Sequence, residues 1–146
     1  MKKVKIRERI RIKLATLLGK WPKTVLQARD WLKKQGLEEE EAGAILEDFL
    51  RSGLLDDAAY ARLFVEGHPG WGVYRLRHEL KRRGVPDVLA GEAIDEAHDP
   101  AVIEALVKDW KKSGIDDRRI AGRLARRGFP AGETMAAIRS SCPGNE

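Results

Sequence analysis

The chain has 146 residues, which suits one compact domain or a short array of small modules. Its 28 basic and 23 acidic side chains give a net charge of +5, and 42% of its residues are hydrophobic, which is too many for a disordered tail. Only 6% of the residues are aromatic, and the Gly and Pro residues fall singly, so a fold of many β-strands is disfavoured and helices are favoured.

The first predicted element is a helix over roughly Arg9 to Gly19, which ends before the Trp21-Pro22 pair. Thr24 and Gln27 then stand three residues apart, which is the spacing of a capping box at the start of a second helix. The segment before this cap, residues 1–23, carries a net charge of +8. A basic start therefore precedes the second helix.

A run of four Glu residues, 38–41, is interpreted as the first turn of a third helix, because the helix dipole favours carboxylates there. Residues 24–66 carry a net charge of −5, in contrast to the basic start. We expect residues 1–53 to form a three-helix module together with the basic N-terminal segment.

A second module is predicted over residues 54–97. Asp56 is a natural N-cap for its leading helix. The apolar stripe of that helix is expected at Tyr60, Leu63, Phe64 and Gly67.

A third module is predicted over residues 98–146, including a short C-terminal tail. Asp99-Pro100 caps and opens its first helix, and Asp116-Asp117 caps the next. The apolar stripe of the first helix is expected at Val102, Leu106 and Trp110.

An internal repeat joins these elements around Gly36, Gly84 and Gly128. Apolar residues stand eight and four residues before each Gly and ten residues after it. The first two share one helical stripe, and a Gly ends a helix at little cost by taking the left-handed conformation. Pro86 and Pro130 fall where a first helical turn tolerates Pro. The apolar repeat positions are Ala28, Leu32, Leu46, Leu76, Leu80, Ile94, Ile120, Leu124 and Ile138.

The pattern as a whole predicts an all-α fold of three tandem three-helix repeats in an elongated, curved array. Each repeat is too small to be stable alone, so neighbouring repeats should share apolar surfaces.

Several function classes are disfavoured by what the sequence lacks. The single cysteine, Cys142, cannot form an internal disulfide, and no two of His68, His78 and His98 have the spacing of a helical metal site. No metal, cofactor or catalytic group is expected, and an enzyme is the least favoured interpretation. No signal peptide or membrane span is recognisable, so the protein is expected to be cytoplasmic. It is also expected to be monomeric.

Basic residues cluster on the second helix of the second and third repeats. Any one such face is ordinarily a solvated surface, but its recurrence at equivalent positions favours a contact with phosphates or with acidic protein surface. Trp71, which lies between two glycines, is a candidate partner anchor, although packing between modules is the simpler explanation. The candidate contact residues are Arg75, Arg77, Lys81, Arg82, Arg83, Arg119, Arg123, Arg126 and Arg127.

Three segments resemble the RecX family of recombination regulators. Residues 53–65, GLLDDAAYARLFV, resemble the family's GLLDD signature. Residues 72–85, GVYRLRHELKRRGV, are similar to a second family segment, and residues 126–129, RRGF, to a third. The resemblance covers about residues 13–140. One departure is the loop over residues 66–72, which has no Lys or Arg where family members usually carry basic residues.

The resemblance implies a regulator of recombination, DNA repair and the SOS response. Such proteins bind the RecA recombinase filament on single-stranded DNA, lie in its groove, and inhibit its ATPase, strand-exchange and co-protease activities. They also bind single-stranded and duplex DNA on their own, without sequence preference. Coating of the groove and capping of filament ends both stay open, as do inhibition and activation.

Three alternatives remain on the residues alone. The first is a helical protein that binds DNA non-specifically and independently of RecA. The second is a helix-turn-helix module, which is disfavoured because the basic residues lie on the second helix of each repeat rather than the third. The third is a helical scaffold for another protein, with no role on nucleic acid.

Overall fold

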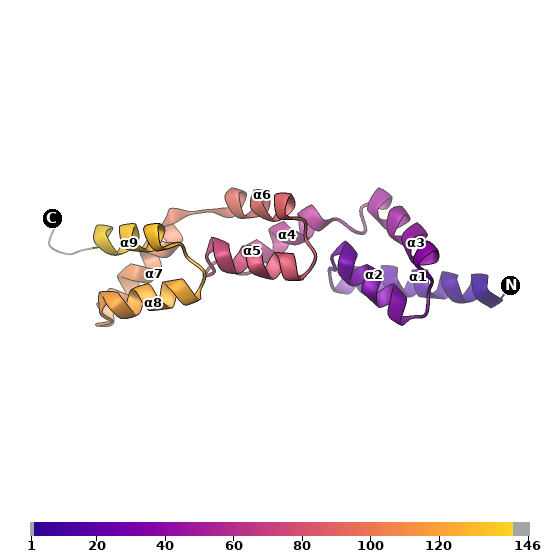
Figure 1. The fold of residues 1–146 in the computed structure, drawn as a ribbon, viewed down its shortest axis with the longest axis horizontal. Coiled ribbons are helices and arrows are strands. Elements are labelled where there is room, and N and C mark those ends of the chain that lie inside the picture. Colours follow the sequence, from indigo (N-terminus) through magenta and orange to yellow (C-terminus); the bar gives the residue numbers. More distant parts are fainter. Residues whose placement is uncertain (1, 142–146) are drawn as a thin grey trace. The chain divides into compact units, whose positions relative to one another are not determined.

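The computed structural model describes residues 2–141, and over that range the chain forms nine α-helices and no strands (Figure 1). Cys142 and the rest of the expected C-terminal tail lie outside these residues. The helices are α1 (Lys2–Lys20), α2 (Val25–Lys34), α3 (Glu39–Ser52), α4 (Asp57–Glu66), α5 (Val73–Arg82), α6 (Asp87–Ala97), α7 (Pro100–Lys112), α8 (Asp117–Arg126) and α9 (Ala131–Ser140).

The chain packs as two compact units, which are described separately. Unit 1 comprises Met1–Ala61 and Leu80–Ala90, and unit 2 comprises Arg62–Glu79 and Gly91–Glu146. The division into modules over 1–53, 54–97 and 98–146 stays a prediction. No helix within the described part of the chain is long and apolar enough to cross a membrane.

The repeat positions form the cores of both units, as predicted. All nine apolar side chains at these positions are buried, and Leu32, Leu80, Ile120 and Leu124 have no exposed area. Each fully buried Leu or Ile stabilises the fold by about 1.5–3 kcal/mol relative to an exposed one. Equivalent positions of the sequence repeat are therefore buried in the same way in each copy.

Helix α1 differs from the expectation of a helix starting near Arg9, because it begins at Lys2. Residues 2–9 are exposed on all sides, and the first buried side chains of α1 are Ile10 and Leu14. Lys, Arg and Glu have high helix propensity, so the helix extends N-terminally beyond the turn that the core covers. The apolar pattern alone could not detect this extension.

The predicted stripe of α4 was right at Phe64 and wrong at Leu63 and Gly67, which are exposed, while Tyr60 is half-buried. Leu63 is 58% exposed, and the buried side chains are Ala61, Phe64 and Val65. A similar difference occurs in α7, where Ile103 and Val107 are buried while the three expected stripe residues, 102, 106 and 110, are half-buried.

The predicted helix ends are confirmed. Thr24 and Gln27 form the capping box before α2, and Gly36, Gly84 and Gly128 take φ values of +92°, +93° and +92°. The Glu run 38–41 lies at the start of α3, with Glu38 as the N-cap residue. The Glu41 carboxylate accepts a hydrogen bond from the Glu38 N–H at 3.4 Å.

The predicted Asp caps also hold. The carboxylates of Asp56, Asp99 and Asp116 accept hydrogen bonds from backbone N–H groups at the starts of α4, α7 and α8 at 3.1, 3.0 and 2.9 Å. Pro86 and Pro130 stand one residue before α6 and α9 rather than inside the first turn.

Candidate functional site

The N-terminus of α2 in unit 1 rests on the Gly-ended loop after α5. The Thr24 hydroxyl is buried and donates a hydrogen bond to the carbonyl oxygen of Arg83 at 2.6 Å. A Cβ on Gly84 would lie 2.4 Å from the Cβ of Leu26, so a larger residue does not fit there. The end of α5 is thereby held against the start of α2.

The same device recurs in unit 2, where the N-terminus of α5 rests on the Gly-ended loop after α8. The Gly72 N–H donates to the carbonyl oxygen of Arg127 at 2.7 Å, and the Tyr74 N–H donates to that of Gly128 at 3.0 Å. A Cβ on Gly128 would lie 2.4 Å from the backbone nitrogen of Arg75. We name these two contacts, at Arg83-Gly84 and at Arg127-Gly128, the loop junctions.

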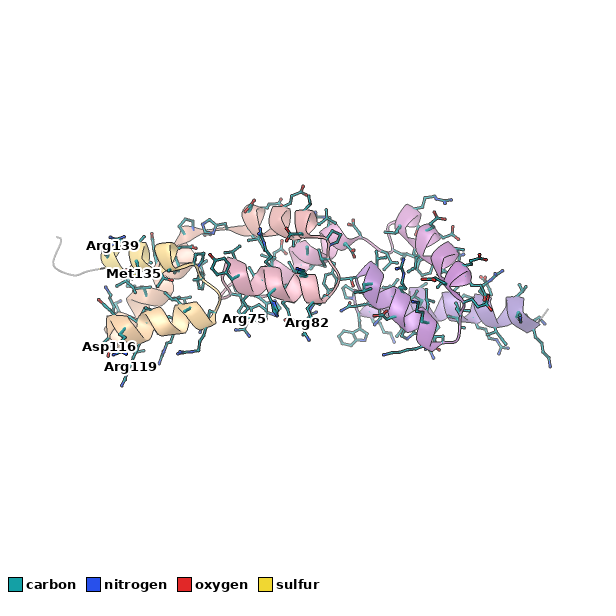
Figure 2. All side chains as sticks on the ribbon, in the orientation of Figure 1. Arg75, Arg82, Asp116, Arg119, Met135 and Arg139 are labelled. Atoms are coloured by element: carbon teal, nitrogen blue, oxygen red, sulfur yellow. The ribbon has the colours of Figure 1, made fainter. Side chains whose placement is uncertain are left out.

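The candidate contact residues divide into two groups. On α5 and α8 the cationic side chains are exposed, and Figure 2 shows Arg75 and Arg119 extending from the same edge of unit 2. Arg83 and Arg127 in the loop junctions are half-buried. We name the exposed candidates of unit 2 the cationic face, which consists of Arg75, Arg77, Arg119, Arg123 and Arg126. The exposed candidates of unit 1 are Lys81 and Arg82.

Arg83 and Arg127 have structural contacts of their own. Besides its carbonyl contact, Arg83 donates from Nη1 to the Tyr60 hydroxyl at 2.6 Å. The Arg127 guanidinium lies 5.1 Å from the Trp110 ring centroid, and its carbonyl holds the start of α5. Both residues therefore support the loop junctions, and their contact with a partner stays a prediction.

Aromatic rings contact two arginines of the cationic face. The Arg75 guanidinium lies 3.9 Å from the centroid of Trp71, and that of Arg123 lies 5.3 Å from Trp110. Each such contact contributes roughly 0.5–1 kcal/mol at an exposed site. The rings thus reduce the freedom of side chains that a phosphate would otherwise have to order.

Trp71 is half-buried, and its role as a partner anchor stays a prediction. Its ring centroid lies 4.1 Å from that of His68 and 5.8 Å from that of Phe64. Trp110 is half-buried as well and packs against the core of unit 2. The sequence analysis did not predict the exposure of Trp21, which follows Lys20 at the end of α1 and is 68% exposed. The signal was present, because Trp21 precedes a Pro and belongs to no apolar stripe.

Asp57, the first residue of α4, links two helices. Its carboxylate accepts a hydrogen bond from the Val25 N–H at 2.9 Å, which ties the start of α4 to the start of α2. Burial raises the pKa of Asp57 above its usual range, and the hydrogen bond from Val25 offsets part of that effect. Asp57 is therefore a structural carboxylate.

Within residues 2–141 no group of three His, Cys, Asp or Glu side chains is arranged to hold a metal ion.

Comparison with known proteins identifies the family. A family model described as RecX, second three-helix domain, matches residues 56–94. The Regulatory protein RecX of Thermobifida fusca (strain YX) is 33% identical over 135 residues, covering 84% of this chain and 73% of that protein. This chain belongs to the RecX family. Another RecX relative, from Streptomyces lividans, is 32% identical over 137 residues, covering 86% of this chain and 73% of its own length.

The RecX fold is equally clear from solved structures. The crystal structure of RecX from Lactobacillus salivarius superposes with a TM-score of 0.86, covering 94% of this chain and 97% of that one at 17% identity. A second crystal structure, of a regulatory protein RecX, gives a TM-score of 0.76 over 92% of this chain and 72% of that one at 20% identity. At these identities the likeness establishes the all-α helical repeat fold and nothing finer.

Proposed function

We propose that this RecX-family protein binds the RecA filament on single-stranded DNA and mainly inhibits its ATPase, strand-exchange and co-protease activities. The observation that carries the proposal is the cationic face, in which arginines recur at equivalent places on α5 and α8. Family membership supports RecA as the partner, because the relatives are named as regulatory RecX proteins.

The mechanism follows from charge and position. Exposed guanidinium groups on successive repeats bind phosphates without reading bases, so the affinity should fall steeply with salt. A body of tandem helices lying along the filament groove would exclude a second DNA strand. It would also hinder the subunit motions that accompany ATP hydrolysis.

The test is ATP hydrolysis by a preformed RecA filament on single-stranded DNA, titrated with this protein at fixed salt. Loss of hydrolysis well below one protein per RecA subunit supports end-blocking or disassembly, and loss near saturation supports coating of the groove. Unchanged hydrolysis at saturating protein contradicts the proposal.

The alternative is DNA binding that is independent of RecA. It is favoured by the four exposed arginines of α8, which are Arg118, Arg119, Arg123 and Arg126. Major-groove reading remains disfavoured, because the third helix of the second repeat, α6, carries Asp87, Glu92, Asp95 and Glu96 and no basic residue. Salt-sensitive DNA binding with no effect on the RecA ATPase would favour this alternative.

A further inference from the structure

A groove of about 420 Å³ opens in unit 2 beside the loop between α4 and α5. Its walls are apolar, and the buried side chains among them are Val65, Leu76, Ala93, Ile94 and Phe129. The volume falls in the range of preformed binding clefts in proteins. None of the nine candidate contact arginines and lysines lines it.

The rim of this groove has the opposite charge to the cationic face. Four carboxylates border it, those of Glu66, Glu96, Asp99 and Glu133, against the single guanidinium of Arg62. Three of these acids, Glu66, Glu96 and Asp99, are exposed. Such a rim repels phosphates, so the groove is unsuited to nucleic acid.

One wall of the groove is already ordered. His68 lies between Phe64 and Trp71, with ring centroids 4.3 and 4.1 Å away, and its Nδ1 lies 2.7 Å from the Phe64 carbonyl oxygen. On the other side His98 Nε2 lies 3.9 Å from a Glu133 carboxylate oxygen. The free-energy cost of ordering these side chains when a partner enters the groove is therefore small.

We propose that this groove binds a protein segment of the RecA filament that carries an aliphatic side chain flanked by Lys or Arg. Apolar walls within a charged rim are the anatomy of a protein–protein contact, and the acidic rim selects basic flanking residues. The choice of RecA as the source of that segment rests on the proposed function. The protein then uses the groove for protein and the cationic face for DNA.

The first experiment tests the chemistry of the groove without RecA. The probes are two short peptides with acetyl and amide ends, Lys-Leu-Lys-Leu-Lys and Glu-Leu-Glu-Leu-Glu. NMR shifts of the methyl groups of Val65, Ile94 and Val102 are followed during titration. The basic peptide should move these signals and the acidic peptide should not. No response to the basic peptide, or an equal response to both, overturns the proposal.

The second experiment tests the partner with matched variants. Ala97 and Glu96 line the groove and are exposed, so Ala97→Trp fills it and Glu96→Lys reverses its rim. The control is Asp95→Lys, which makes the same charge change on the same helix at an exposed residue outside the lining. We expect both groove variants to lower the affinity for the RecA filament about tenfold and the control to leave it unchanged. All three should bind single-stranded DNA alone without loss.

A photo-crosslinking amino acid at position 97 then reports what enters the groove. Crosslinks to RecA, at a segment with the stated residues, support the proposal, and crosslinks to DNA overturn it. Wild-type protein that does not bind the filament at all would refute the proposed function and the choice of RecA together. Groove variants that bind the filament as tightly as the wild type would refute only the groove.

Discussion

The backbone N–H of Gly72 donates a 2.7 Å hydrogen bond to the carbonyl oxygen of Arg127, which joins the start of α5 to the loop after α8. In unit 1, Thr24 makes the equivalent contact with Arg83 at 2.6 Å through its side chain. The junction in unit 2 therefore positions α5 against the loop after α8. The contribution of the loop junctions to stability can be tested separately from the charge of the cationic face.

Gly128→Ala should destabilise the protein severely. The new Cβ would lie 2.4 Å from the backbone nitrogen of Arg75, and the φ of +92° is unfavourable for Ala. The control is Gly36→Ala, at the same place in the first repeat, where φ is also +92° but no atom lies within 4 Å. We expect the control to cost about 1 kcal/mol and Gly128→Ala at least about 2 kcal/mol more. Chemical denaturation measures both, and equal losses would contradict the junction.

Thr24→Val should lower the free energy of unfolding by about 1–2 kcal/mol. The substitution removes the cap on the Gln27 N–H and leaves the carbonyl of Arg83 without its hydroxyl donor. Thr16→Val is the control, because the Thr16 hydroxyl bonds only within α1 and is exposed. A loss at Thr24 no larger than the loss at Thr16 would show that the contact contributes little.

Arg119→Gln with Arg126→Gln should weaken binding to single-stranded DNA and reduce its dependence on salt. If each arginine contacts one phosphate, the slope of log K against log salt falls in magnitude by about 1.4. The control is Arg139→Gln, which removes one positive charge from α9, where Figure 2 shows Arg139 away from the edge that carries Arg119. The single variants Arg119→Gln and Arg126→Gln match it in charge. Fluorescence anisotropy over a range of salt concentrations measures the slope. An unchanged slope in the double variant would remove these arginines from the interface.

Asp57→Asn should leave the protein as stable at neutral pH or more stable. The amide oxygen can still accept from the Val25 N–H, and the partly buried charge is gone. Because the pKa of Asp57 is raised by burial, the native state binds this proton more tightly than the unfolded state does. The stability difference should therefore be present at neutral pH and disappear as the pH falls through the raised pKa.

Thermal unfolding of the Asp57→Asn variant and the wild type at several pH values between 7 and 4 checks this prediction. An advantage of the variant that grows as the pH falls would mean that the carboxylate is stabilising in the native protein. Asp56→Asn serves as the comparison, because Asp56 is exposed and its carboxylate caps α4.

The core could be predicted from the sequence because the apolar residues of the repeat have the same spacing before each Gly. Residues four and eight before a Gly fall on the same stripe of a helix, and all of them are buried. The stripe of α4 could not be placed as well, because Ala61 and Val65 compete with Tyr60 and Leu63 and only the packing of the neighbouring helices decides between them. The extent of α1 escaped prediction because residues 2–9 fold by propensity without burial.

The candidate site was only partly visible in the sequence. The arginines of α5 and α8 were found from their spacing, since one helix face collects residues three and four apart. The contacts of Trp71 with Arg75 and of Trp110 with Arg123 could not be predicted, because they depend on the tertiary fold. The acidic groove escaped as well, since its rim comes from α4, α6, α9 and the segment between α6 and α7.

The loop junctions have a consequence for how such a chain can be built. In unit 2 both hydrogen bonds of the junction run from backbone to backbone, and only the glycines at positions 72 and 128 need to be small. The exposed side chains of α5 and α8 can therefore change in charge while the junction of unit 2 stays intact. The surface of this unit is free to adapt to a partner independently of the contacts that hold its helices together.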